Sequence, residues 1–219
     1  MARRMIKLTF AVLIALSASA SAGLGWTAER PATTWVSVER DIFEQVNAYR
    51  ASAGLPPVAQ SASLTAVAHA HVRDLAVNRA DLQQNAQGQA CSLHSWSTQG
   101  PWTPVCWTGS AQDAERMWSK PREITGGAYV GNGYEIAFGP APGSGDGRAV
   151  TSAAALDGWR GSPLHNAVVL ERGVWTGRHW RAMGVGALGG FAVVWFGDTP
   201  DPAADKRPPA RPHVHKDDR

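Results

Sequence analysis

The stretch A-M-G-V-G-A-L-G-G-F-A-V-V-W-F, residues 182–196, decides the fold class of this chain. Two apolar runs, residues 182–188 and 191–196, flank the dipeptide Gly189-Gly190, a pattern that is typical of a β-hairpin. The segments before the hairpin are mostly helical in pattern, and no internal repeat is visible. Because the helices come first and the hairpin last, the sequence predicts an α+β layered domain rather than a repeated βαβ unit.

Four helices and one further strand are predicted upstream of this hairpin. Residues 37–53 and 61–80 have apolar residues at the 3.6-residue spacing of helices, and residues 151–160 continue helically to Gly161. Ser162-Pro163 suits the cap and first position of a short helix that runs to residue 170. Residues 133–138 form a short strand candidate.

Residues 81–130 show no clean hydrophobic period. The segment contains both cysteines, four tryptophans and several Gly and Pro residues. We expect an ordered loop region that is held by a disulfide and by buried indoles. The tryptophans are expected to be core side chains more often than a platform for sugar or lipid.

The first 22 residues have the layout of a secretory signal peptide. A positively charged start precedes an apolar run at residues 8–16 and then small residues, with cleavage expected after Ala22 or Ala20. The apolar run is shorter than the roughly 20 residues that span a bilayer. We therefore expect a secreted or periplasmic protein without a transmembrane segment, the alternatives being an uncleaved anchor or a buried helix.

The charge balance and the C-terminal composition limit the partners. The chain has 21 Lys+Arg and 18 Asp+Glu, and three of the positive residues lie in the signal, so the exported form is formally neutral. No basic cluster stands out, and nucleic acid is not an expected partner. Residues 198–219 are rich in Pro and charge and are predicted to be a disordered tail, removable after Thr199 without loss of the fold. We expect a monomer.

The two cysteines, Cys91 and Cys106, are predicted to form one disulfide, because export exposes thiols to an oxidising compartment. Free thiols are the alternative. A closed loop of about 16 residues stabilises the folded chain by ~3 kcal/mol in the chain-entropy account.

Six motifs in a fixed order add a resemblance to a known family. They are N-A-Y-R at 47–50, L-x-x-x-A-x-x-H at 64–71, H-S-W at 94–96, G-Y-E-I-A at 133–137, W-R-G-S-P-L-H at 159–165 and M-G-V-G at 183–186. In this order they resemble the CAP superfamily of cysteine-rich secretory, antigen five and pathogenesis-related proteins, most closely its bacterial branch. The resemblance implies an α-β-α sandwich with a central antiparallel sheet. The resemblance runs from about Asp41 to Gly197. We expect an N-terminal lead at residues 23–36 and a CAP-like domain at 37–197, with an inserted disulfide loop at about 98–130.

The resemblance also implies a surface cleft with two histidines and two acidic residues. His94 matches the first histidine of the family pattern, Glu135 the first glutamate and His165 the second histidine. The position of the second glutamate is Ser162 in this chain, and Asp157 lies on another side of the helix. The set of four is therefore incomplete, and an activity that needs two carboxylates is in doubt.

Two neutral imidazoles with one carboxylate suit a borderline divalent metal such as zinc. We expect His94 and His165 to be the metal-capable pair and Glu135 to orient a histidine or a bound water. The main interpretation is a non-catalytic module that binds a small ligand, a lipid or a divalent metal. The alternatives are a metal-dependent hydrolase acting on peptide or cell-envelope material, and a secreted factor that acts through surface contacts.

The remaining histidines and serines are weaker candidates. His69 and His71 are two positions apart on a helix, so they cannot chelate together, and we expect one to pack and the other to be exposed. His179 is expected in a loop. A serine hydrolase is not favoured because the chain lacks a G-x-S-x-G motif.

Overall fold

The computed structural model describes residues 36–141 and 148–203, so the expected signal peptide lies outside the described residues. Its α-helices are α1 Ser37–Ser52, α2 Ala62–Asn78, α3 Ala111–Trp118, α4 Lys120–Ile124, α5 Ser152–Gly161 and α6 Pro163–Val169. Its strands are β1 Tyr134–Phe138, β2 Ala182–Leu188 and β3 Phe191–Gly197, and two short 3-10 helices are η1 Ala80–Leu82 and η2 Gly173–Trp175.

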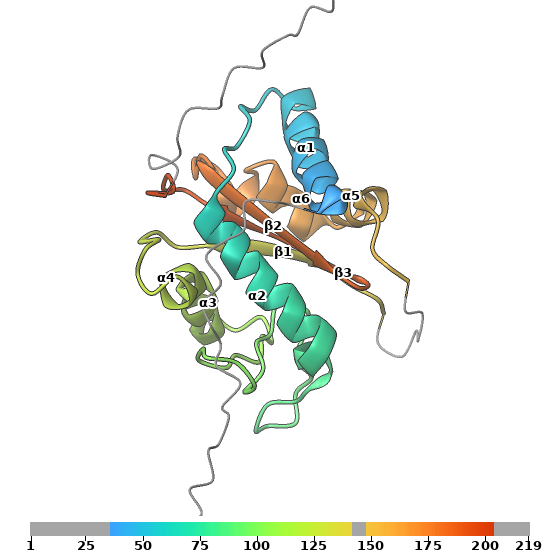
Figure 1. The fold of residues 1–219 in the computed structure, drawn as a ribbon, viewed down its shortest axis with the longest axis vertical. Helices are drawn as coiled ribbons and strands as arrows, with labels where there is room; N and C mark the ends of the chain where they lie inside the picture. The colour runs from blue at the N-terminus through green and yellow to red at the C-terminus, as the bar shows by residue number, and fades with distance from the viewer. Residues whose placement is uncertain (1–35, 142–147, 204–219) are drawn as a thin grey trace, which may run out of the picture.

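The described strands form an antiparallel sheet in the order β1-β3-β2, with helices on both faces (Figure 1). On one face the sheet packs against α2 and α3, and on the other against α1, α5 and α6. The α+β class and the sandwich architecture are therefore confirmed, and so is the hairpin of β2 and β3.

Strand β3 lies in the centre and separates two hydrophobic cores. Its residues at 191, 193 and 195 pack with α2, whereas those at 192, 194 and 196 pack with α1, α5 and α6. All seven residues of β3 are buried, because successive side chains point to opposite faces and both faces are covered. Burial on both faces explains why the strand sequence F-A-V-V-W-F is continuously apolar.

The glycines of β2 bring helix α2 against the backbone of the sheet. A Cβ at Gly184 would lie 2.1 Å from the carbonyl carbon of Leu64, and one at Gly186 would lie 2.6 Å from that of Ala68. No side chain fits between the two elements at these positions. The spacing M-G-V-G therefore fixes how closely α2 approaches the sheet.

Residues 81–130 differ from the loop region that the sequence predicts, because they contain α3 and α4. Helix α3 is capped by Ser110, whose hydroxyl accepts a hydrogen bond from the Asp113 amide, but the helix buries only Ala114 and Met117. Two buried residues in eight do not establish a helical period. The predicted disulfide is confirmed, with Cys91 and Cys106 joined at a Cα–Cα distance of 4.9 Å.

Two predicted details at the ends of elements are corrected. Ser162 precedes α6 as expected, but its side chain makes no capping hydrogen bond.

The tail does not begin at residue 198, because residues 198–203 pack on the domain. The Thr199 carbonyl accepts a hydrogen bond from the Tyr129 hydroxyl, and the buried Asp201 carboxylate accepts from the Ser61 hydroxyl and the Ser63 amide. Deletion after Thr199 would remove the Asp201 contacts.

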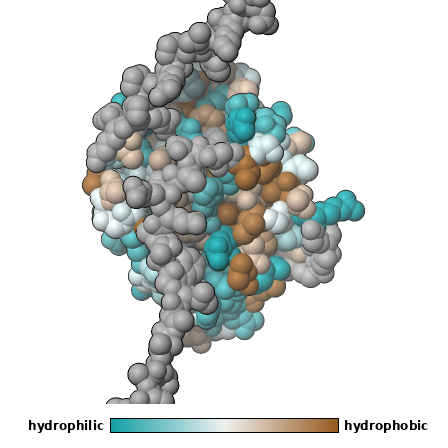
Figure 2. All heavy atoms as spheres, in the orientation of Figure 1, coloured by the Kyte–Doolittle hydropathy of each residue, from teal (hydrophilic) through white to brown (hydrophobic). Residues whose placement is uncertain are grey.

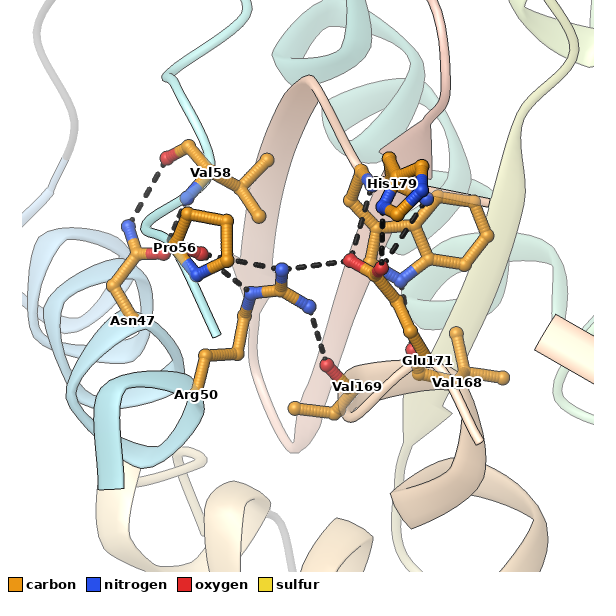
Figure 3. A network of polar contacts seen from close by, with 9 residues as sticks. Asn47, Arg50, Pro56, Val58, Val168, Val169, Glu171 and His179 are labelled. Carbon is orange, nitrogen blue, oxygen red and sulfur yellow. Dashed lines mark hydrogen bonds and ion pairs between the residues drawn. The ribbon is translucent and has the colours of Figure 1, made fainter. Parts of the chain in front are cut away.

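The N-A-Y-R motif is structural. Fully buried Arg50 donates to the carbonyls of Pro56 and Val169 and forms an ion pair of 2.7 Å with Glu171 (Figure 3). Asn47 exchanges two hydrogen bonds with the backbone of Val58. Together these contacts tie the end of α1 to the following loop and to the segment after α6.

The surface is mixed in polarity. Figure 2 shows hydrophobic residues gathered in a band on the visible face, with hydrophilic residues around them. Among the described residues, no helix is both long enough and apolar enough to cross a membrane.

Candidate functional site

Glu135 on β1 is the centre of the candidate cleft. Its strand neighbours Tyr134 and Ile136 pack into the core formed with α1, α5 and α6, so alternation turns Glu135 toward the α2 side. The Glu135 side chain is only 3% exposed, and its two oxygens face two different histidines. The carboxylate is thus buried but fully engaged.

The first partner is His71, which α2 places on its buried face. Nδ1 of His71 lies 2.6 Å from Oε1 of Glu135 in an ion pair whose direction departs from that of an ideal hydrogen bond. Nε2 lies 3.1 Å from the carbonyl oxygen of Ser95, and the ring stacks on Trp96 at 4.3 Å. Both ring nitrogens of His71 therefore face oxygen atoms, and the ring is held between Glu135 and the Ser95 carbonyl.

The second partner is His94, in the loop between η1 and α3. Its Nδ1 lies 2.9 Å from Oε2 of Glu135, and its side chain is 23% exposed. A carboxylate can only accept, so Nδ1 carries the proton of the neutral ring and Nε2 keeps its lone pair. Glu135 thereby fixes the tautomer in which Nε2 of His94 can bind a ligand.

His165, in the first turn of α6, completes the cluster. Its ring centroid is 5.7 Å from that of His94. Burial and the neighbouring His94 lower the pKa of His165, and they outweigh the opposing effect of Glu135. His165 is therefore held as a neutral imidazole, which is the form that binds metals or accepts a proton.

Electrostatics keep Glu135 ionised. Burial alone would raise the pKa of this carboxyl, but the close contact with His71 and the hydrogen bond from His94 lower it to about 2. Glu135 is consequently a fixed anion at all physiological pH values. A group with so low a pKa is a poor general base.

The segment between η1 and α3 adds an aromatic side chain to the histidine cluster. The ring of Trp107 meets that of His94 edge-on at 6.2 Å between centroids. The half-buried Ser162 occupies the position of the family's second glutamate, and its side chain forms no hydrogen bond within the described part of the chain. Within the part of the chain that the structure describes, Glu135 is thus the one carboxylate in contact with His71 and His94.

A complete metal centre is not preassembled in this cleft. Within residues 36–141 and 148–203, no group of three or more His, Cys, Asp and Glu side chains could together hold a metal ion. Both oxygens of Glu135 already contact histidines, which leaves His94 and His165 as the two open donors. Such a pair fits only an open, weakly held ion that is completed by water.

His71 is the site residue that sequence reasoning missed. The prediction that His69 and His71 differ in exposure is right: His69 is 43% exposed and binds Glu39, whereas His71 is fully buried. His71 ends the motif L-x-x-x-A-x-x-H at residues 64–71, which is the one local signal that points to it. Its contact with Glu135 spans 64 positions, and no local pattern encodes it. His179 lies in a loop as expected, with its side chain 80% exposed.

Comparisons with known proteins give one family. Residues 43–183 match the model of the cysteine-rich secretory protein family, CAP. An extracellular protein containing an SCP domain from Bacillus anthracis str. Ames is similar in structure, with 19% identity, a TM-score of 0.47 and coverage of 73% of this chain and 40% of that chain. An outer surface protein from Borrelia burgdorferi is also similar in structure, with 13% identity, a TM-score of 0.44 and coverage of 74% of this chain and 95% of that chain. This chain spans less than half of the Bacillus protein. No curated protein matches the sequence.

Proposed function

The chain belongs to the cysteine-rich secretory protein family, CAP, and on that premise we propose that it is an extracellular, non-catalytic binding module whose histidine cleft holds a divalent metal ion such as zinc. The observation that carries the proposal is the orientation of His94. Glu135 engages Nδ1 of His94 and leaves Nε2 open, with the neutral ring of His165 5.7 Å away between centroids.

The proposed ligands are Nε2 of His94 and a ring nitrogen of His165. Neutral imidazole is a good ligand for zinc, and a carboxylate behind one histidine makes that histidine more basic and fixes its ring. When bound, zinc would supply a Lewis acid with positions open to water. Glu135 and His71 would act behind the ligands, because neither has a free donor atom directed outward.

The absence of catalysis is part of the proposal and rests on the acids. Among the described residues, Glu135 is the carboxylate that faces both histidines; it is buried between them, and its pKa, lowered to about 2, does not suit a general base. Ser162 stands where a second acid would be needed. A metal-dependent hydrolase of peptide or cell-envelope material is therefore less well supported.

Export is supported by the sequence of residues 1–22 and by the disulfide, since disulfides persist in oxidising compartments. Determining the N-terminal sequence of the exported form tests whether the signal peptide is cleaved. We expect it to begin at Gly23 or Ser21, and an exported chain that retains Met1 would contradict cleavage.

Titration calorimetry with zinc tests the binding function. Wild type should bind one ion, and His94→Ala and His165→Ala should each abolish measurable binding. His179→Ala is the matched control, because this exposed loop histidine lies outside the cleft. Glu135→Gln should weaken binding by releasing the tautomer of His94. Unchanged zinc affinity in both cleft variants would refute the site.

A further inference from the structure

A hollow lies within residues 103–123, and its lining includes none of the residues of the histidine cluster. It has a volume of about 300 Å³ and is lined by Thr103, Arg116, Ser119, Arg122 and Glu123. These residues come from the loop before α3 and from α3, α4 and their junction. We call this hollow the arginine cavity. Its volume is at the lower end of the range for ligand pockets, so it suits a small group.

The guanidinium groups of Arg116 and Arg122 at the cavity have N–H donors that are not used in hydrogen bonds to described residues. The exposed Arg116 side chain makes no hydrogen bond or ion pair to any described residue. Arg122 is also exposed and uses one nitrogen to donate to the Val130 carbonyl, which leaves its other N–H groups open. Each guanidinium presents a planar fork that matches two oxygens of an oxyanion.

The one carboxylate of the cavity does not neutralise these arginines. Oε1 of Glu123 accepts a hydrogen bond from the Thr103 amide, and Oε2 forms an ion pair with the buried ammonium of Lys120. Lys120 also donates to the Thr103 carbonyl and lies over the Trp96 ring at 5.4 Å. Both carboxylate oxygens are therefore occupied by groups inside the protein.

The charge that remains is positive. Two cations line the cavity, Arg116 and Arg122, and its carboxylate, Glu123, is already paired with Lys120 beneath the wall. Asp113 and Glu115, the acidic residues of α3, do not line it. A dianion would balance this excess, and the hydroxyls of Thr103 and Ser119 offer further polar contacts along the wall.

We propose that the arginine cavity binds a phosphate group, either as inorganic phosphate or as the phosphomonoester headgroup of a lipid. A phosphate carries close to two negative charges at neutral pH, and paired guanidinium groups recognise its oxygens in a bidentate manner. This site goes beyond the proposed zinc function and does not depend on it. It uses only residues of the inserted region.

The test is titration calorimetry with inorganic phosphate in the presence of a metal chelator, which keeps the result independent of zinc. Arg116→Ala and Arg122→Ala should each weaken phosphate binding by about tenfold or more, as expected for the loss of charge-assisted hydrogen bonds. Both side chains are exposed, so the melting temperature should stay unchanged. Arg40→Ala on the exposed side of α1 is the control and should bind like wild type.

Flotation with vesicles distinguishes the two sources of phosphate. Vesicles with phosphatidic acid present a phosphomonoester, whereas vesicles of equal charge with phosphatidylglycerol present only a diester. Capture by the former alone, lost in Arg116→Ala, assigns the cavity to a lipid headgroup; calorimetric binding without capture assigns it to a soluble phosphate. Binding of neither probe, or a loss in Arg40→Ala equal to that in the cavity variants, would overturn the proposal.

Discussion

At the scale of the single residue, Glu135 organises the cleft through two contacts of different kinds. Its ion pair with His71 is closed to solvent, whereas its bond to His94 presents that histidine at the surface. A buried carboxylate is costly unless it is paired, so the two histidines stabilise the charge that in turn orients one of them. Altering one member should therefore affect the others.

Replacing His71 tests this dependence. His71→Gln removes the imidazole that pairs with one oxygen of a buried carboxylate and should lower the free energy of unfolding by about 3–5 kcal/mol, measured by denaturant titration at pH 7. His179→Gln, at an exposed loop position, should change it by less than about 0.5 kcal/mol. Equal small effects in both variants would show that His71 is not the partner that stabilises Glu135.

The protonation of His165 gives a second residue-scale prediction. Because burial and His94 lower its pKa, the ring should lose its proton below pH 6.5 in a titration followed by NMR. In His94→Ala the pKa should move upward, since one of the two lowering effects is gone. A pKa at or above 6.5 in wild type would contradict the assignment of a neutral ligand.

At the scale of the element, the sequence predicts those helices and strands whose apolar residues follow a long or regular pattern. The hairpin, α1, α2 and α5 follow from periodicity and from the Gly-Gly turn. Helix α4 has five residues, fewer than two turns, and its buried positions include a lysine, so no period can reveal it. Likewise the contact of His71 with Glu135 joins two elements, and only the packing of α2 on the sheet brings them together.

The close approach of α2 to β2 can be tested at a single glycine. In Gly184→Ala the new methyl group would collide with the backbone of α2, which cannot turn aside, and should destabilise the fold by about 1–3 kcal/mol or more. Gly161→Ala at the end of α5 meets no atom within 4 Å and should be neutral or slightly stabilising. Thermal melting of the two variants decides.

At the scale of the whole molecule, the segment after the last strand returns to the start of α2. The Asp201 carboxylate binds the hydroxyls of Ser61 and Ser63 and the amide of Ser63, where a negative charge also favours the helix N-terminus. A chain ending at Thr199 should lose about 1–3 kcal/mol of stability relative to one ending at Ala203. Equal stability of the two chains would show that this segment adds nothing.

The same carboxylate makes stability depend on pH. Burial tends to raise the pKa of Asp201, but hydrogen bonds from Ser61, Ser63 and Ala203 lower it below 3.8. The Asp201 contribution is therefore fully present above pH 3.8 and is lost as the pH falls through the lower, folded-state value. Denaturant titrations from pH 6 to 3 should show a steeper loss for wild type than for Asp201→Asn, and parallel curves would contradict this role.

The contact between Trp107 and His94 gives the protein an optical signal of its own. Indole fluorescence responds to a neighbouring imidazole, and the ring of Trp107 contacts that of His94. Trp107 is partly exposed, whereas Trp96, Trp159 and Trp195 are buried in the hydrophobic cores. Emission from the buried indoles should stay constant, while emission from Trp107 changes with the charge of His94 and with metal binding to it. A difference spectrum against Trp107→Phe would therefore follow the cleft in solution without any added dye.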